Sequence, residues 1–124
     1  MDNFKHFYRK TKDRLFGYLI RLTGDYELSR DIMQESYARY LERYRNRELR
    51  LSLLFTIARN KAMDHFRKQS RTELTSESEK QRSSHDGEYL LLVREEYRLV
   101  LRAMMQLPTQ ERDLLSMVVS SGLS

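Results

Sequence analysis

The sequence lacks cysteine and has a single proline and only four glycines among its 124 residues. The missing cysteines exclude disulfide bonds, thiolate zinc sites and a cysteine nucleophile. Few glycines and prolines, with 33% charged residues, suit a helical protein. No apolar run approaches the roughly 20 residues of a membrane-spanning helix, and the N-terminal stretch MDNFKHFYRKTKDRLF is too charged for a signal peptide. We therefore expect a soluble, cytoplasmic protein with no segment inserted in a membrane.

The sequence also has little that would support catalysis. Its three histidines, His6, His65 and His85, show no metal-ligand spacing, so we expect no metal site. No serine–histidine–aspartate ordering, phosphate-binding loop or paired-carboxylate cleft is recognisable. These absences predict a protein that is not an enzyme and needs no cofactor.

Positive charge is concentrated in the middle third of the chain. The formal net charge is +5, and the segment from Tyr40 to Arg71 has nine basic residues against three acidic ones. After Arg71 acidic residues are in excess. This asymmetry suggests an element that meets a polyanion, although a solvated basic helix face explains the pattern equally well.

Apolar residues recur at helical spacing in five segments. Gly24 fits a left-handed residue that closes the first helix, and Asp25 can cap the second. The stretch 70–88 is polar and rich in serine and glutamate, which predicts a flexible linker. The fold class is therefore all-α, with a three-helix domain at 1–69 and two further helices at 89–124. The predicted helices cover about residues 3–22, 26–44, 49–69, 89–105 and 110–120.

The aromatic side chains invite assignment as stacking platforms for nucleic-acid bases. Most of them fall at core spacing, so we assign the set to packing, with stacking as the alternative for Tyr40 and Tyr44. The set is Phe4, Phe7, Tyr8, Phe16, Tyr18, Tyr37, Tyr40, Tyr44, Phe55 and Phe66.

The last two predicted helices are expected to lack a partner. The chain ends LPTQERDLLSMVVSSGLS, in which Gly122 would end a helix and Ser124 would cap another. We therefore expect a fragment of a longer protein. The apolar residues of the last helix should stay partly uncovered, and either dimerisation or packing on the first domain would cover them. They are Leu114, Leu115, Met117, Val118 and Val119.

Three stretches of the sequence carry a resemblance to a known family. GYLIRLTGDYELSRDIMQESYARYLERY is similar to the second region of the extracytoplasmic-function (ECF) sigma factors of bacterial RNA polymerase, and LLFTIARNKAMDHFRK to the helix that follows it. LRAMMQLPTQERDLLSMVVSSGLS resembles the start of their fourth region. The departures are a short loop between the second and third helices, and Leu53 where the family often has tryptophan.

The resemblance implies a binding subunit of RNA polymerase that directs transcription initiation. A three-helix region-two domain would bind the clamp helices of the β′ subunit. It would also recognise and melt the minus-ten promoter element, mainly through the non-template strand. The linker and a truncated region-four domain would follow, without the helix-turn-helix that reads the minus-thirty-five element. Anti-sigma factors commonly occlude these surfaces in the family, so such a partner is implied too.

The polymerase-binding residues implied by the resemblance lie in the second predicted helix. Gln34 and Glu35 can supply hydrogen bonds and a charge partner for clamp arginines, framed by Arg30 and Met33. Without the resemblance, this segment would more often be a solvated helix face with local pairs. The full set is Arg30, Asp31, Met33, Gln34, Glu35 and Tyr37.

The DNA-binding residues are expected on and around the third predicted helix. Melting DNA requires basic residues that hold phosphates and a group that reads an unstacked base. Asn60 has donor and acceptor groups for a base edge. Asp64 can accept from an exocyclic amine, or it can form an ion pair with a neighbouring basic residue. The set is Arg47, Arg50, Arg59, Asn60, Lys61, Asp64, Arg67 and Lys68, with Arg39, Arg43 and Ile57 placed by resemblance alone.

Two other classes of function remain open at this stage. A helical RNA- or ribosome-binding module would use the same basic helix and bind structured RNA without polymerase, but it gives no reason for the segment 31–37. A structural adaptor would bind a protein through its last helices and would not depend on Asn60 or Arg59.

Overall fold

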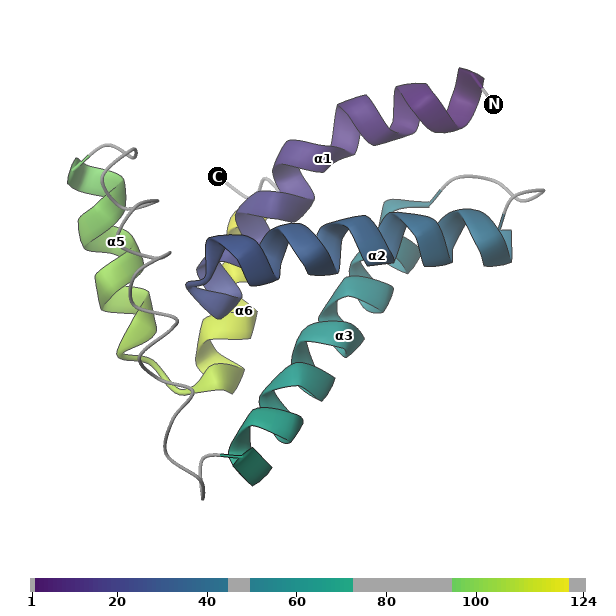
Figure 1. Ribbon diagram of the computed structural model, residues 1–124. Helices are drawn as coiled ribbons and strands as arrows, with labels where there is room; N and C mark the ends of the chain where they lie inside the picture. Colours follow the sequence, from purple (N-terminus) through teal and green to yellow (C-terminus); the bar gives the residue numbers. More distant parts are fainter. Residues whose placement is uncertain (1, 45–49, 73–94, 121–124) are drawn as a thin grey trace.

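The computed structural model describes residues 2–44, 50–72 and 95–120, and every regular element in these ranges is an α-helix (Figure 1). The predicted all-α class is therefore confirmed. The helices are α1 (Asp2–Thr23), α2 (Tyr26–Tyr44), α3 (Leu51–Thr72), α5 (Glu95–Met105) and α6 (Thr109–Ser120). None of these described helices is long and apolar enough to cross a membrane.

The end of α3 differs from the sequence prediction. The helix continues to Thr72, so residues 70–72 are helical and do not belong to the predicted linker. No glycine or proline interrupts this stretch, so nothing local ends the helix where the apolar pattern stops. The rest of the predicted linker, and the predicted helical residues 89–94, lie outside the described residues.

The turn between α1 and α2 forms as the sequence predicts. Gly24 has a positive φ of 68°, and its amide still donates to the carbonyl of Ile20 at 2.8 Å. Asp25 Oδ1 accepts the amide of Leu28 at 3.0 Å, which satisfies one of the free donors at the start of α2. A left-handed glycine followed directly by a capping aspartate allows α2 to fold back along α1.

The core lies between α1, α2 and α3, and each helix contributes one apolar stripe. In the first part of α1 the buried residues Phe7, Thr11 and Leu15 recur every four positions on one face of the helix, whereas residues 18–22 near its end are all buried. Small side chains in α3, Ala58 and Ala62, are fully buried and allow close approach of the neighbouring helices. The buried cluster is Phe7, Leu15, Tyr18, Leu19, Leu22, Ile32, Tyr37, Tyr40, Leu54, Phe55, Ala58 and Ala62.

Tyr40 is a packing residue, as assigned from the sequence. Its side chain is fully buried, and its ring stacks on Phe7 with the centroids 5.5 Å apart. Its hydroxyl accepts the backbone amide of Arg50 at 2.7 Å. Tyr40 therefore joins the core to the residue that precedes α3. The side chain of Tyr44 lies outside the described residues.

Helix α6 packs along α1, and α5 also contacts α1 (Figure 1). The side of α6 that faces the three-helix core is mostly polar: Ser116 and Ser120 are buried, and Met117 is half-buried against the core cluster. The apolar residues predicted to stay uncovered are exposed on the other side, from 39% for Val118 to 66% for Leu114. The prediction is therefore confirmed for Leu114, Leu115, Val118 and Val119.

Candidate functional site

The outward face of α2 presents most of the residues predicted to bind a protein partner. Ser29, Ile32 and Ser36 point into the core and are buried, so most of the residues between them lie on the outer side of α2. Met33 and Tyr37 border this face, but Met33 is half-buried and Tyr37 is only 5% exposed. The exposed members are Arg30, Asp31, Gln34 and Glu35.

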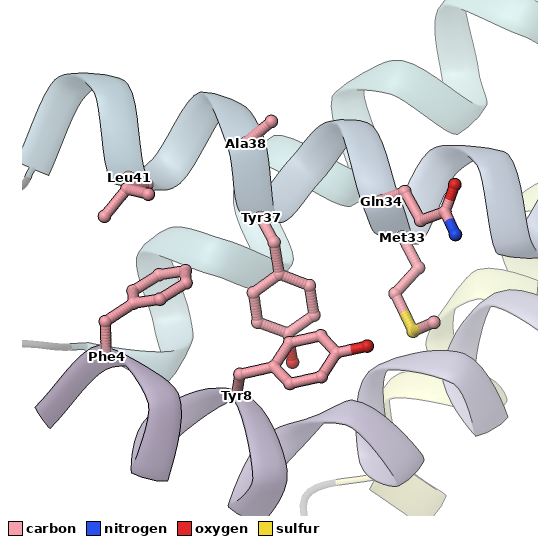
Figure 2. A pocket seen from close by; sticks show the side chains of 7 residues that line it. All are labelled: Phe4, Tyr8, Met33, Gln34, Tyr37, Ala38 and Leu41. Atoms are coloured by element: carbon pink, nitrogen blue, oxygen red, sulfur yellow. The ribbon is translucent and has the colours of Figure 1, made fainter. Parts of the chain in front are cut away.

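A hollow of about 210 Å³ lies between this face of α2 and the N-terminal half of α1. Figure 2 shows Phe4 and Tyr8 of α1 facing the Tyr37 ring of α2 across it. The Tyr8 and Tyr37 rings meet edge to face with centroids 4.7 Å apart. Because the lining is mostly apolar and aromatic, the hollow suits an apolar side chain of a partner. The lining residues are Phe4, Tyr8, Met33, Gln34, Tyr37, Ala38 and Leu41.

Sequence reasoning assigned only three of these lining residues to the binding face. Phe4 and Tyr8 were placed in the core, and Ala38 and Leu41 had no binding role. A signal was present in the spacing, because Phe4 and Tyr8 lie one turn apart in α1, as do successive members of Met33, Tyr37 and Leu41 in α2. Two such stripes on adjacent helices can border a groove when their side chains do not fill the space between the helices.

The Tyr37 hydroxyl is fixed in its neutral form on the floor of this region. Its oxygen lies 2.6 Å from Thr11 Oγ1, and the Thr11 hydroxyl donates to the carbonyl of Phe7 at 2.7 Å. Burial raises the pKa of Tyr37 to about 12, because desolvation disfavours a phenolate. Tyr37 therefore offers a ring edge to the hollow and uses its hydroxyl within the fold.

The predicted DNA-binding residues of α3 lie mainly on its solvent side. Arg59, Asn60, Asp64, Arg67 and Lys68 are exposed, and Lys61 is half-buried. Ile57 is half-buried against the core cluster. Outside this helix Arg39, Arg43 and Arg50 are exposed, while Arg47 lies outside the described residues.

Several of these charged groups already have partners. Arg67 Nη1 pairs with Asp64 Oδ1 at 3.2 Å within α3, which is the local ion pair that the sequence left open for Asp64. Lys61 Nζ lies 3.3 Å from Glu35 Oε2 of α2. This pair places the basic face of α3 beside the outward face of α2. Asn60 is exposed, and its side chain forms no hydrogen bond within the part of the chain that the structure describes.

The third ion pair joins α3 to α6. Arg59 Nε donates to Asp113 Oδ2 at 2.8 Å, and Tyr18 Oη donates to the other oxygen of the same carboxylate at 2.5 Å. Burial, and next the hydrogen bond with Asp113, raise the pKa of Tyr18 well above its usual value. The hydrogen bond with Asp113 also raises the pKa of Arg59. Both donors therefore keep their protons, and the carboxylate is held between them.

Two arginines complete the polar contact between α6 and α1. Arg112 Nε donates to the carbonyl of Leu22 at 2.5 Å, and its guanidinium lies 5.8 Å from the Phe66 ring centroid. Burial lowers the pKa of Arg112. Arg21 is only 9% exposed and donates to Ser120 Oγ and to the carbonyl of Ser116 at the C-terminal end of α6. A cation suits this end of a helix because the helix dipole is negative there.

No group of three potential metal-ligating side chains occurs among the residues that the structure describes. The arrangement thus consists of a polar face with an apolar hollow on α2, beside a basic face on α3.

Comparison with known families identifies this three-helix unit. The sequence profile of Sigma-70 region 2 matches residues 7–72, which is more than half of the chain. The chain therefore belongs to the Sigma-70 region 2 family, whose members are non-enzymatic and act in promoter recognition and RNA polymerase binding. No curated protein and no solved structure matches the chain. The sigma-factor resemblance is confirmed over α1 to α3, while the ECF subgroup and the region-four start remain predictions.

Proposed function

We propose that this chain is part of an ECF sigma factor that acts in the cytoplasm with RNA polymerase. In this proposal α2 binds the clamp helices of the β′ subunit, and α3 binds the non-template strand of the minus-ten element. The observation that carries the proposal is the juxtaposition of the two faces, marked by the 3.3 Å pair between Lys61 and Glu35. A polymerase bound on α2 would lie directly beside DNA bound on α3.

The form of the α2 face supports the polymerase role. A coiled-coil partner needs an apolar anchor point surrounded by polar groups that fix orientation. The hollow supplies the anchor point, and Gln34 at its rim supplies a donor and an acceptor. Glu35, whose side chain is 67% exposed, can exchange its lysine partner for an arginine of the clamp.

The composition of the α3 face supports the DNA role. Arg59, Lys61 and Arg67 offer three cations along about two turns of helix, which suits a line of phosphates. The Asn60 side chain lies among them, makes no hydrogen bond to the described residues and can read a base edge. Asp64 is occupied by Arg67, so we assign it to holding that arginine rather than to a base contact.

The remaining partners follow from the same surfaces. An anti-sigma factor would bind over the α2 and α3 faces and so exclude polymerase and DNA. Helices α5 and α6 would begin the region-four domain, by the resemblance of their sequence to that region. Their exposed apolar residues would pack on the rest of that domain or on a second copy of the chain.

Binding to an isolated β′ clamp coiled coil tests the polymerase role. We expect the chain to bind it with a Kd in the micromolar range or tighter, as measured by calorimetry. The double variant Gln34→Ala, Glu35→Ala should weaken binding at least about tenfold, which corresponds to 1.4 kcal/mol. The single variant Gln34→Ala should account for part of that loss.

A matched control uses the same pair of residue types elsewhere on the surface. Gln106 and Glu111 are both exposed, so Gln106→Ala, Glu111→Ala removes equivalent groups without touching α2. This control should bind the clamp as the unmodified chain does. A folded chain that does not bind the clamp, or two double variants that weaken binding equally, would refute the assignment of α2.

A further inference from the structure

The carboxylate of Asp113 occupies a position where two donors converge. Tyr18 Oη reaches one oxygen at 2.5 Å and Arg59 Nε reaches the other at 2.8 Å. These donors come from α1 and α3, which are neighbours in the three-helix core. The carboxylate arrives from a residue 95 positions after Tyr18. The two donors thus belong to the three-helix unit, and the carboxylate comes from α6, outside this unit.

The chemistry of this pair suits a phosphate as well as a carboxylate. A guanidinium and a hydroxyl are both common donors to phosphate oxygens in protein–DNA contacts. The raised pKa of Tyr18 means that its hydroxyl remains a donor at neutral pH. The side chain of Arg59 is 46% exposed even with Asp113 in place, so its free edge already faces solvent.

The way α6 is held makes exchange feasible. Around Asp113, α6 contacts the core through hydrogen bonds from Arg112 and Arg21 and through the half-buried Met117. Its other apolar side chains, Leu114, Leu115, Val118 and Val119, are exposed. Polar contacts of this kind can be replaced by water or by another polar ligand at a small net cost. A helix that buried a large apolar face would dissociate from the core far less readily, because that apolar surface would become exposed to water.

We propose that Tyr18 and Arg59 form a binding site for a backbone phosphate of nucleic acid, and that Asp113 occupies this site as an intramolecular competitor. Nucleic acid bound at α3 then takes the place of the carboxylate and displaces this part of α6. Tyr18, which the sequence analysis assigns to packing, then donates a hydrogen bond to the phosphate. The proposal rests on the proposed DNA role of α3 and adds a second donor and a competing group.

The test measures binding of a fluorescein-labelled, AT-rich single-stranded oligonucleotide to the full chain by anisotropy, at one fixed salt concentration. Asp113→Asn should tighten binding about threefold to tenfold, as expected for loss of one competing ion pair and its hydrogen bond. Adding Tyr18→Phe to that variant should reverse much of the gain. Tyr18→Phe alone should have little effect, because it removes one donor both from the competing carboxylate of Asp113 and from the phosphate.

Two controls separate competition from a change in overall charge. Glu111→Gln changes the net charge equally at an exposed position of the same helix and should alter the affinity less than about twofold. Asp113→Glu keeps the carboxylate and should keep the lower affinity. If Asp113→Asn matches Glu111→Gln, or if Tyr18→Phe changes nothing in the Asp113→Asn background, the proposal is wrong.

A measurement on the unmodified chain guards against variants that fold poorly. Saturating oligonucleotide should increase amide hydrogen exchange in α6 (Thr109–Ser120), because DNA and Asp113 compete. Unchanged exchange in α6 would overturn the proposal. The outcome is independent of clamp binding. If the chain binds the clamp but shows no competition, only this inference is refuted. If it shows competition but does not bind the clamp, only the polymerase assignment of α2 is refuted.

Discussion

Replacing Tyr40 by phenylalanine tests how the start of α3 is fixed. The Tyr40 side chain is fully buried, and its hydroxyl accepts the Arg50 amide at 2.7 Å. Phenylalanine keeps the ring stacked on Phe7 and removes only the acceptor. A hydrogen bond of this kind contributes about 1 kcal/mol. Arg50 is exposed, so water can reach its amide and the cost should not exceed about 1.5 kcal/mol.

Urea denaturation followed by circular dichroism measures this effect. With an m value of about 2 kcal/mol/M, a loss of about 1 kcal/mol lowers the urea midpoint by roughly 0.5 M. The m value itself should not change, because the same surface is exposed on unfolding. Hydrogen exchange should also accelerate at the Arg50 amide, which loses its acceptor.

Tyr8→Phe is the matched control for this variant. Tyr8 is half-buried on the same core, and its hydroxyl forms no hydrogen bond within the described residues. Its removal should therefore shift the midpoint much less. Equal shifts for the two variants, or unchanged protection of the Arg50 amide, would refute the role given to the Tyr40 hydroxyl.

Two further predictions concern the α1–α2 turn and the floor of the hollow. Gly24→Ala should lower the free energy of unfolding by about 1–2 kcal/mol, because φ is 68° and a methyl group would collide with the Met105 side chain. Gly17→Ala is the comparison in thermal unfolding, because its methyl group would meet only the end of the Arg21 side chain. Equal costs for the two variants would contradict the prediction. Tyr37 should titrate near pH 12 in an absorbance titration, and Tyr37→Phe should remove that transition. Because its folded pKa is raised, its contribution to stability is intact below about pH 10. It is lost as the pH rises to about 12. A Tyr37 that titrates like an exposed tyrosine would contradict the assignment.

Much of the fold could be predicted because it depends on local signals. Apolar periodicity indicated α1, α2 and α3, and the pair Gly24–Asp25 indicated the turn, since each residue's conformational preference acts within a few positions. In α2 the structure buries Ile32 and Ser36 and exposes Arg30, Asp31, Gln34 and Glu35.

The orientation of α6 could not be predicted in this way. The sequence predicted that its apolar residues stay partly uncovered, as Leu114 and Val119 do, but nothing in it indicated that the side with Ser116 and Ser120 would pack on the core. The reason is nonlocal: Arg21 and Arg59 of the core each find an acceptor on the polar side of α6. Nothing near Asp113 in the sequence indicates that it meets Tyr18, so this contact required the tertiary structure.

The ion pair between Lys61 and Glu35 couples the outward face of α2 to the basic face of α3. If α2 binds polymerase and α3 binds DNA as proposed, a substitution at Glu35 that weakens polymerase binding also releases Lys61 and so increases the positive field at α3. The pair is exposed, and the effect should stay below about 1 kcal/mol, but its sign is opposite on the two surfaces. A Glu35 variant should thus have a lower affinity for polymerase and a higher affinity for DNA. Gln34 borders the hollow and pairs with no residue of α3 in the described structure, so under the proposed function a substitution there should change polymerase binding alone.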